Sequence, residues 1–540
     1  MKRVAATIKG PKGGSWDLFI GLEVHAQIKL QSKLFSRSQA AAPSEHDQPN
    51  SRVSLFDASF PGTLPVLNAS AVDQAVRTAL ALGSDVHRRS VFERKHYFYS
   101  DLPHGYQITQ QRHPIASGGS LPLVFEPTPS SPNTATAAAA ANTNTNTNTN
   151  TTPTPATKTA TTKATQTATS AKHDGAPNPV PLPLSVGITR IQLEVDSGKS
   201  LHDSASDNTR DKTGRGQSLV DLNRAGTALM EIVFEPEIRS AAEAGATLRS
   251  LQLFLRKLRS CDGNMEDGSM RCDLNVSVRP AGGEGLGVRV EVKNMNSVRH
   301  LMTAAAFEAL RQVRQLELGK GPVERETRGF DVAKGETTRL RRKEGQVDYR
   351  FFPEPDLPPL LLDDAKVDAM KATLPELPEA TLARLSRDYG IPEHLSRLIV
   401  CAAAGGASEY FESVVNGRGG GDGVRRDPKV AANWVSNNLF GLLKDNFGRS
   451  HGLSDNEDEL ERLFPADRLG GLLDLLGDGT ISSQTAKALL REMVQEDHSS
   501  SAMEIVEARG LRQMTDLGEI ESLCRGIVQD PKHAKQVRGF

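Results

Sequence analysis

Four segments of the chain alternate apolar and polar side chains with a period of two, which is typical of β-strands that are buried on one face. They span residues 17–30, 187–196, 270–279 and 288–294. Each segment carries acidic residues at polar positions, so pairing in one antiparallel sheet would bring several carboxylates to the same face. Carboxylates that converge repel one another and need cations nearby. The pattern therefore predicts an acidic trough that holds cations; the alternative is a set of scattered, solvent-facing acids.

The first alternating segment contains a carboxylate beside an imidazole. Glu23 and His25 lie on one face of the predicted strand, opposite Leu22 and Val24. Such a pair can bind a divalent cation that carries nucleotide phosphates. The alternative is the polar, solvent-facing side of an ordinary strand. The other segments would add further acids to the same trough, namely Glu194, Asp196, Asp273 and Glu291.

The 540-residue chain is almost neutral, because 65 Lys and Arg residues are balanced by 66 Asp and Glu residues. A nucleic-acid partner would therefore be bound through local basic patches and not through a global field. The length predicts about two to four domains. The four cysteines form no C-x-x-C pair, which argues against a disulfide scaffold and against a ribbon-type zinc site. There is no run of about 18 apolar residues, so the sequence predicts no membrane span.

Composition divides the chain into regions. Residues 1–16 are basic and contain no acid, which is compatible with a mitochondrial transit peptide or with a disordered N-terminus. Residues 127–183 consist mainly of Thr, Ala, Asn and Pro and cannot bury a core, so we expect a disordered insertion between two strands of one domain. A Pro-rich stretch that ends near residue 360 predicts the exit from this domain, and helical segments follow it.

Local signals predict several further elements. Apolar residues recur at helical spacing over 71–82, and a long helix is expected over 298–318. The sequence Ser240-Ala-Ala-Glu243 predicts a capping box at the start of another helix. Residues 92–103 combine aromatic rings, charges and a proline, which is typical of a binding loop more than of a core strand.

A series of sequence blocks in the first two-thirds of the chain resembles the GatB/GatE family, the B subunits of aspartyl/glutamyl-tRNA amidotransferases. The strand Gly-Leu-Glu-Val-His and the run Asp-Tyr-Arg-Phe-Phe-Pro-Glu-Pro-Asp-Leu are two of them. All blocks occur in the family's order. They lie at residues 21–25, 61–68, 94–103, 218–227, 230–237, 265–279, 291–297, 326–331 and 348–357.

The resemblance implies an α+β fold. Such proteins have a cradle domain built on an antiparallel sheet, then a helical domain, then a helical tail domain that touches tRNA. In this sequence we expect the cradle over residues 17–360, the helical domain over 361–455 and the tail over 456–540, ending before the family's usual final helices. The insertion and the basic N-terminus suggest a eukaryotic chain, for which the family implies the mitochondrial matrix.

The resemblance also implies an activity. With ATP and Mg²⁺, the cradle phosphorylates the side chain of glutamate misattached to glutamine tRNA. Ammonia that the glutaminase partner (the A subunit) releases from glutamine then displaces the phosphate. A small third subunit completes such a complex. By resemblance, the metal ligands are Glu23, His25, Glu231, Asp273 and Glu291; the catalytic residues are Glu23, His25 and Glu194; the candidate phosphate contacts are Arg94 and Lys95.

The chain departs from the family pattern in the second alternating segment, residues 187–196. The family usually has His-x-Glu-Glu-Asp where this chain has Gln192-Leu-Glu-Val195-Asp. One histidine and one acid are therefore missing, which keeps open a second hypothesis, a tRNA-binding scaffold without the kinase chemistry. A free-standing small-molecule carboxylate–amine ligase is a third. Phosphorylation that depends on the misacylated tRNA separates the three.

Overall fold

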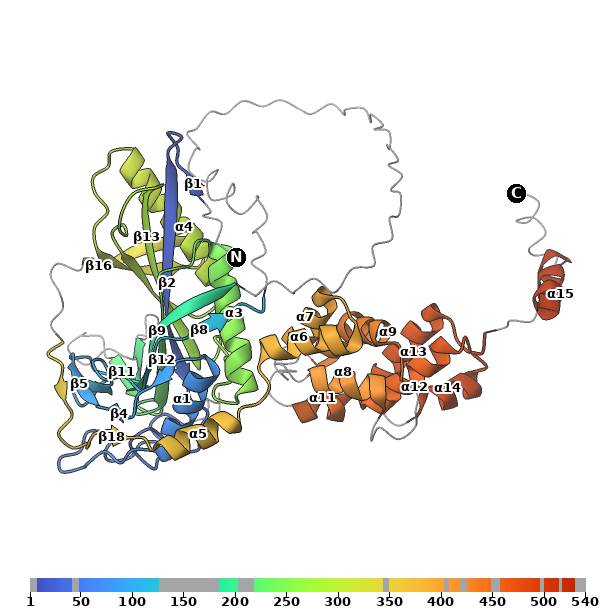
Figure 1. Ribbon diagram of the computed structural model, residues 1–540, viewed down its shortest axis with the longest axis horizontal. Coiled ribbons are helices and arrows are strands. Elements are labelled where there is room, and N and C mark those ends of the chain that lie inside the picture. Colours follow the sequence, from blue (N-terminus) through green and yellow to red (C-terminus); the bar gives the residue numbers. More distant parts are fainter. Residues whose placement is uncertain are drawn as a thin grey trace, which may run out of the picture.

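A computed structural model describes residues 7–40, 48–125, 184–202, 218–342, 349–402, 407–417, 425–447, 457–495, 500–513 and 517–529. A sheet-containing region forms the first two-thirds of the chain, and a helical region follows it (Figure 1). The predicted α+β class is confirmed. No helix among the described residues has the length and apolar character needed to cross a membrane.

The first region is built on one large, mainly antiparallel sheet. Its strands follow the order β16-β15-β14-β13-β2-β12-β9-β7-β3, with β1 added beside β2 and β8 beside β9. All pairs are antiparallel except β14 with β15. The strands are β1 Thr7–Lys9, β2 Ser15–Gln27, β3 Asp85–Val86, β7 Ala116–Ser117, β8 Ser120–Pro122, β9 Ser185–Val195, β12 Ala228–Phe234, β13 Met270–Pro280, β14 Val290–Met295, β15 Glu326–Asp331 and β16 Glu336–Arg342.

Strand β2 lies in the middle of this sheet, between β12 and β13. Its alternating residues Leu18, Ile20, Leu22, Val24 and Ala26 are all buried in the core. Each large aliphatic side chain buried in this way contributes roughly 1.5–3 kcal/mol to folding. The predicted period-two pattern is therefore confirmed, and the core fixes which face of β2 is left for Glu23 and His25.

Helices α3 Ala241–Lys257 and α4 Val298–Glu317 pack against each other, and α4 packs on β13. The amide of Gln312 in α4 donates to the backbone carbonyl of Val276 in β13. Helix α1 Ala69–Ala81 packs near β9 and confirms the helix predicted over 71–82. Only half of the predicted capping box forms, because Ser240 accepts from the Glu243 amide while Glu243 accepts from Arg239 N–H.

The N-terminal hairpin belongs to the fold. Strand β1 pairs with the start of β2, with Ile8 opposite Trp16. The carboxylate of Glu317 accepts hydrogen bonds from the Lys12 backbone, at 2.6 Å, and from the Trp16 indole, at 2.7 Å. The fold therefore begins before the predicted boundary at residue 17.

The tract 127–183, predicted to be an inserted disordered segment, lies outside the described residues. Its flanks are strand neighbours, because β8 pairs with β9 through Ser120 opposite Gly187. Just beyond them, the Leu123 amide donates to the Leu184 carbonyl at 2.7 Å. The flanking geometry is that of an insertion between two paired strands.

The segment 92–103 is not simply a loop. Strand β5 Glu93–His96 pairs with β6 Tyr106–Thr109 on one side and with β17 Phe352–Pro353 on the other. The loop prediction was wrong for Glu93–His96, which has one partner strand, β17, far away in the sequence, whereas residues 97–103 contain no helix or strand, as predicted. The remaining strands form two small pairs, β4 Arg89–Ser90 with β18 Leu360–Leu361 and β10 Lys199–His202 with β11 Ser218–Asp221.

The second region is helical, as predicted. A π-helix, η3 Trp434–Leu439, lies between α9 and α10. The α-helices are α5 Asp364–Ala372, α6 Pro378–Tyr389, α7 Glu393–Cys401, α8 Ala407–Asn416, α9 Pro428–Asn433, α10 Phe440–Phe447, α11 Glu457–Leu463, α12 Ala466–Gly477, α13 Ser483–Gln495, α14 Ala502–Arg509 and α15 Leu517–Gln529. Helices α11 and α12 both pack on α8, across the boundary predicted at residues 455/456, so that boundary stays a prediction.

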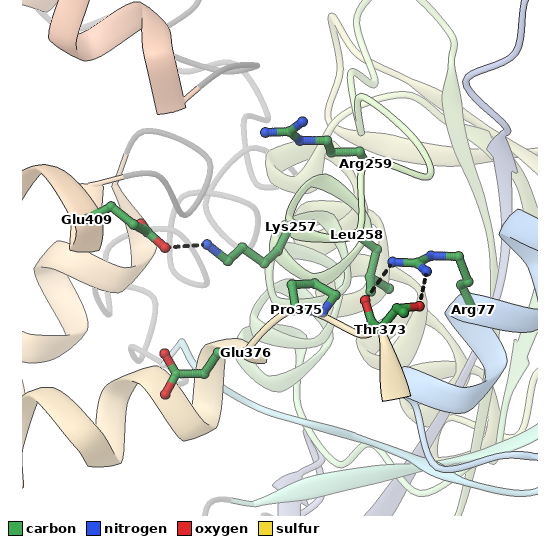
Figure 2. A pocket seen from close by; sticks show the side chains of 8 residues that line it. All are labelled: Arg77, Lys257, Leu258, Arg259, Thr373, Pro375, Glu376 and Glu409. Atoms are coloured by element: carbon green, nitrogen blue, oxygen red, sulfur yellow. Dashed lines mark hydrogen bonds and ion pairs between the residues drawn. The ribbon is translucent and has the colours of Figure 1, made fainter. Parts of the chain in front are cut away.

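A cavity of about 350 Å³ lies where the two regions meet (Figure 2). Lys257, at the end of α3, forms an ion pair of 2.8 Å with Glu409 in α8. Arg77 in α1 donates to the side chain and the backbone of Thr373 after α5. These contacts tie the sheet region to the helical region at the cavity wall.

Candidate functional site

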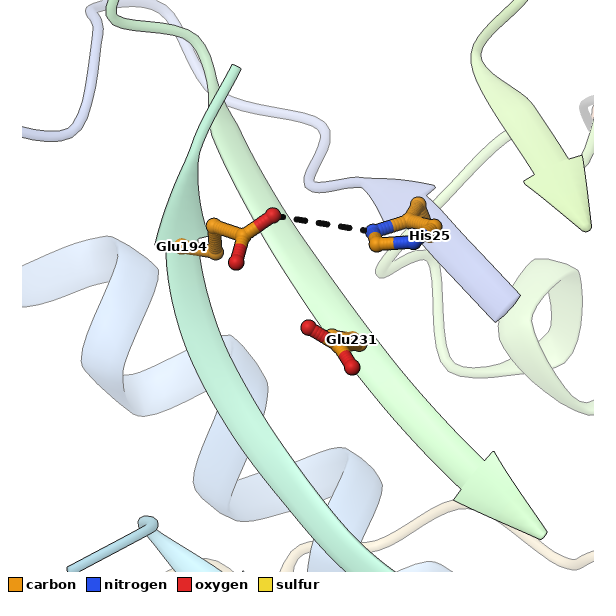
Figure 3. A group of neighbouring side chains, drawn as sticks. All are labelled: His25, Glu194 and Glu231. Atoms are coloured by element: carbon orange, nitrogen blue, oxygen red, sulfur yellow. Dashed lines mark ion pairs between the residues drawn. The ribbon is translucent and has the colours of Figure 1, made fainter. Parts of the chain in front are cut away.

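The polar face of the sheet brings together side chains from three adjacent strands. Glu231 in β12 lies directly opposite His25 in β2 and, on its other side, opposite Gln192 in β9. Glu194 follows Gln192 by two residues and therefore shares its face. His25, Glu194 and Glu231 each offer a ligand atom, and these atoms lie within 4.8 Å of one another (Figure 3). We call these residues the His25 group.

One oxygen of Glu194 in the His25 group has no hydrogen-bond partner. Glu194 is buried, and its Oε2 finds no donor among the described residues. The other oxygen, Oε1, lies 3.8 Å from His25 Nδ1. A buried carboxylate oxygen without a hydrogen bond is costly. Carboxylate and imidazole donors that converge around such an oxygen fit a divalent cation.

Glu231 is a buried acid of this group, as Glu194 is. Burial raises its pKa first, and the neighbouring Glu194 raises it further, while His25 and Lys95 act in the opposite direction. The amide of Gln192 donates to Glu231 Oε2 at 2.8 Å. A nearby cation would favour the charged form of this carboxylate.

A second group of acids lies next to the first, on β2, β13 and β14. Asp273 is directly opposite Glu23, and the ligand atoms of Glu23, Asp273 and Glu291 lie within 4.8 Å of one another. We call these residues the Glu23 group. The five predicted metal ligands therefore divide between two groups, with Glu23 and His25 in different ones.

The Glu23 group already contains a cation from the chain itself. Lys293 Nζ lies 2.9 Å from Asp273 Oδ2 and 3.5 Å from Glu291 Oε1. Burial lowers the pKa of Lys293, but Asp273 and Glu291 outweigh it, so the net shift is upward. Asn275 donates to Glu23, and Thr327 donates to Glu291. These contacts leave the His25 group as the better candidate for an added cation.

The two predicted phosphate contacts lie in different places. Lys95 Nζ is 3.8 Å from Glu194 Oε2 and lies over the ring of Tyr349 at 5.6 Å. Burial lowers the pKa of Lys95, but Glu194 and then Glu231 more than compensate, so the amine stays charged. Arg94, one residue earlier on β5, instead makes a two-pronged contact of 2.7 Å with Glu354. The phosphate role of Arg94 stays a prediction.

Val195, which departs from the family pattern, and Asp196, which matches it, have different surroundings. Val195 is buried in the apolar core, on the face opposite Glu194. Asp196 is held by two arginines, with Arg271 Nη2 at 2.8 Å and Arg224 Nε at 3.3 Å. Asp196 is therefore neutralised by the chain and does not join the His25 group.

Sequence reasoning assigned no role to two cations at these sites, Lys293 and Arg190. Lys293 shares a face with Glu291 in the alternation, which was a usable signal. Arg190 precedes Gln192 and Glu194 at the same period of two, and its Nη2 lies 3.8 Å from Glu231 Oε1. The polar face therefore combines carboxylates, an imidazole and lysine and arginine side chains, a set that can hold a divalent cation and an anionic substrate together.

Comparison with known proteins gives the family. The model of the GatB/GatE catalytic domain matches residues 18–368, and that of the GatB domain matches residues 409–539. The chain belongs to the GatB/GatE family. The mitochondrial B subunit of the glutamyl-tRNA(Gln) amidotransferase of Phytophthora infestans is 45% identical over 552 residues, covering 99% of this chain and 90% of the relative.

Bacterial members of the GatB/GatE family are similar over the same extent. The B subunit of the aspartyl/glutamyl-tRNA(Asn/Gln) amidotransferase of Granulibacter bethesdensis is 42% identical over 97% of this chain and 90% of the relative. That of Rhodospirillum rubrum is 42% identical over 98% of this chain and 92% of the relative. The family resemblance seen in the sequence blocks is thereby confirmed.

Proposed function

We propose that this chain is the B subunit of a tRNA-dependent, glutamine-dependent amidotransferase, a carbon–nitrogen ligase that converts Glu-tRNA(Gln) to Gln-tRNA(Gln). The family membership and the names of the relatives support the amidotransferase class. The single observation that carries the chemistry is the His25 group, in which a buried oxygen of Glu194 has no hydrogen bond and lies 3.8 Å from the Lys95 ammonium.

The proposed reaction has two steps. A side-chain carboxylate oxygen of the glutamyl group attacks the γ-phosphorus of ATP, the bond from that phosphorus to the β–γ bridging oxygen breaks, and ADP leaves with the electron pair. Ammonia then attacks the acyl carbon, the carbon–oxygen bond to phosphate breaks, and ammonia gives up a proton. Glutaminyl-tRNA and inorganic phosphate are the products. The glutaminase partner would supply the ammonia by hydrolysing glutamine.

The chain's residues would position two anions that otherwise repel each other. His25, Glu194 and Glu231 would hold Mg²⁺, which supplies charge neutralisation for the nucleotide phosphates. Lys95 would contact a phosphate oxygen from the other side of Glu194, and Arg94 is a second candidate. Glu23, Asp273 and Glu291, with Lys293 among them, would keep the adjacent part of the trough ordered. Glu23 is retained as a candidate catalytic residue because it shares the polar face of β2 with His25.

The names of the relatives support a cellular location and partner chains for this protein. A mitochondrial location, in the matrix, is proposed because one relative is named mitochondrial. The relatives are named as B subunits, which supports partner chains, and we propose the glutaminase (the A subunit) and a small third subunit. The cradle, helical and tail domains over 17–360, 361–455 and 456–540 remain a proposed division. The helical part would carry the tRNA contacts.

The test is γ-phosphate transfer from ATP to Glu-tRNA(Gln) by the chain co-expressed with its partners. We expect the wild type to transfer phosphate, and His25→Ala and Glu194→Gln to lose at least about a hundredfold in rate, with tRNA affinity unchanged. Glu23→Ala tests the second group separately. Glu336→Gln, which removes an exposed carboxylate on β16, is the matched control. A wild type that binds tRNA and transfers no phosphate would favour the scaffold; phosphorylation of free glutamate would favour the small-molecule ligase.

A further inference from the structure

Gln192 connects three parts of the site through one side-chain amide. Its Nε2 donates to Glu231 Oε2 at 2.8 Å and to Thr109 Oγ1 at 3.1 Å, and its Oε1 accepts from Arg190 Nε at 2.8 Å. The residue is almost completely buried. Thr109 lies on β6, which pairs with the strand that carries Lys95. The amide therefore joins the His25 group to Arg190 and to the strand pair beside Lys95.

The chemistry of the neighbours fixes the orientation of this amide. A carboxylate accepts hydrogen bonds only, and a guanidinium donates only. A flipped amide would place NH₂ against the Arg190 guanidinium and its oxygen against Glu231, so both contacts would become repulsive. The orientation with nitrogen toward Glu231 and oxygen toward Arg190 is therefore the stable one.

The hydrogen bond between Arg190 and Gln192 orients the guanidinium of Arg190. The Nε–H is used by Gln192, while Nη2 lies 3.8 Å from Glu231 Oε1, which is beyond hydrogen-bond distance. Among the described residues, the terminal nitrogens of Arg190 have no hydrogen-bond acceptor. Its side chain is 25% exposed, so these nitrogens can be reached from the trough. Planar guanidinium forks match the spacing of phosphate oxygens.

Arg190 and Lys95 flank the His25 group from two sides. Arg190 approaches Glu231, and Lys95 approaches Glu194. Two cationic side chains thus face two carboxylates, and a divalent cation bound between them would leave the site positively charged. An anion with several oxygens, such as a nucleotide triphosphate, would then be attracted to this point.

We propose that Arg190 is a phosphate-binding residue of this site and that Gln192 is the positioning residue that orients it. The inference rests on the proposed function, because the phosphate is that of MgATP. It also explains how Gln192 can take the place of the histidine that the family usually has at this position. A neutral histidine has one ring nitrogen that donates and one that accepts, so it can join Glu231 to Arg190 as Gln192 does.

The experiment compares five forms of the chain in complex with its partner subunits: wild type, Arg190→Lys, Arg190→Met, Gln192→Leu and Gln192→His. KM for MgATP and kcat are measured in the phosphate-transfer assay, and Mn²⁺ affinity is measured without nucleotide by electron paramagnetic resonance. Arg89→Ala, which removes an exposed charge on β4, is the control. Circular dichroism and tRNA affinity verify that each variant is folded.

We expect Arg190→Lys and Arg190→Met to raise KM for MgATP by about tenfold or more, as the loss of one charge-assisted hydrogen bond predicts. Their Mn²⁺ affinity should stay within about twofold of wild type, because Arg190 is not a cation ligand. Gln192→Leu should raise KM and weaken Mn²⁺ binding, and Gln192→His should restore both. Wild-type KM in both Arg190 variants would overturn the inference alone. A wild-type complex that transfers no phosphate from ATP would overturn the proposed function, and this inference with it.

Discussion

The ammonium of Lys293 lies 2.9 Å from a carboxylate oxygen of Asp273. The same ammonium is 3.5 Å from Glu291, so one lysine neutralises a group of acids that could otherwise hold a metal ion. The two acidic groups on this face of the sheet therefore have different surroundings. The Glu23 group is closed by an internal cation, whereas an oxygen of Glu194 in the His25 group lacks a hydrogen bond.

Replacing Lys293 by Met keeps the length of the side chain and removes the charge. We expect a loss of about 1–2 kcal/mol in unfolding free energy without divalent cations, since the lysine is 36% exposed and water screens the pair. Mg²⁺ should recover part of this loss by occupying the space among the three acids. Thermal unfolding of the variant with and without Mg²⁺ measures both effects. Equal Mg²⁺ responses of variant and wild type would show that the lysine does not stand in for a metal.

Glu194→Gln separates stability from cation binding. The amide has no charge to bury, so the variant should be more stable than wild type by about 1 kcal/mol in the absence of cations. It should lose most of the stabilisation that Mn²⁺ or Mg²⁺ gives the wild type, because binding to the folded state alone raises stability. Unfolding midpoints across a cation titration test this. A variant with the wild-type cation response would remove Glu194 from the ligand set.

Glu308 is the centre of a buried network that joins α4 to β15 and β16. It is fully buried and accepts hydrogen bonds from Arg311, Gln312 and Thr337, and Arg328 lies 3.4 Å away. Glu308→Ala removes the acceptor of Gln312 and Thr337 and one of the two acids that Arg311 and Arg328 contact, the other being Glu326, so we expect a loss of about 2–3 kcal/mol. Glu336→Ala, at an exposed position on β16, should cost little.

The two tryptophans of the chain allow this loss to be localised. Trp16 lies in the sheet region and Trp434 in the helical region. In a Trp434→Phe background, Trp16 is the only tryptophan. There, Glu308→Ala should move the midpoint of urea unfolding, followed by fluorescence, to a lower urea concentration. In a Trp16→Phe background, where only Trp434 reports, the shift should be smaller. Equal shifts would mean that the two regions unfold as one unit.

The four cysteines should differ in reactivity. Burial raises the pKa of Cys401 to about 12, although Arg397 and Arg249 act against it, so its thiolate at pH 8 is about a thousandfold scarcer than that of a thiol at the reference value of 9.0. Cys261 and Cys272 are buried, and Cys524 on α15 is exposed. Iodoacetamide at pH 8 should therefore modify Cys524 alone, as read by mass spectrometry, and Cys524→Ser should take no label. Labelling of Cys401 should rise about tenfold per pH unit while the fold persists; rapid labelling at pH 8 would contradict its burial.

Much of the sheet could be predicted from local patterns. The alternation in β2, β9 and β13 reported correctly which residues face the core, because period two follows directly from strand geometry. The same alternation placed Glu23, His25, Glu194 and Asp273 on polar positions. It could not report the register between strands far apart in sequence, which decides that Glu231 lies opposite His25 and Asp273 opposite Glu23.

Local patterns also could not predict which charged residues form ion pairs with each other. Arg94 and Lys95 are neighbours in sequence, yet alternation on β5 sends Arg94 to Glu354 and Lys95 to Glu194. The acid that binds Arg94 is 260 residues away, and no local signal connects them. Asp196 was expected among the cation-binding acids, but the two arginines that neutralise it come from β13 and from the turn before β12.

The connection between β8 and β9 can change in length without changing the geometry of the site. Leu123 and Leu184 share a hydrogen bond, so the chain leaves and re-enters the sheet region at nearly one point. Each doubling of a loop between such points costs only about 0.6 kcal/mol. Evolution can therefore lengthen or shorten the tract without moving Arg190, Gln192 and Glu194 on the same strand. For the same reason, a fluorescent protein could be grafted there as an internal label.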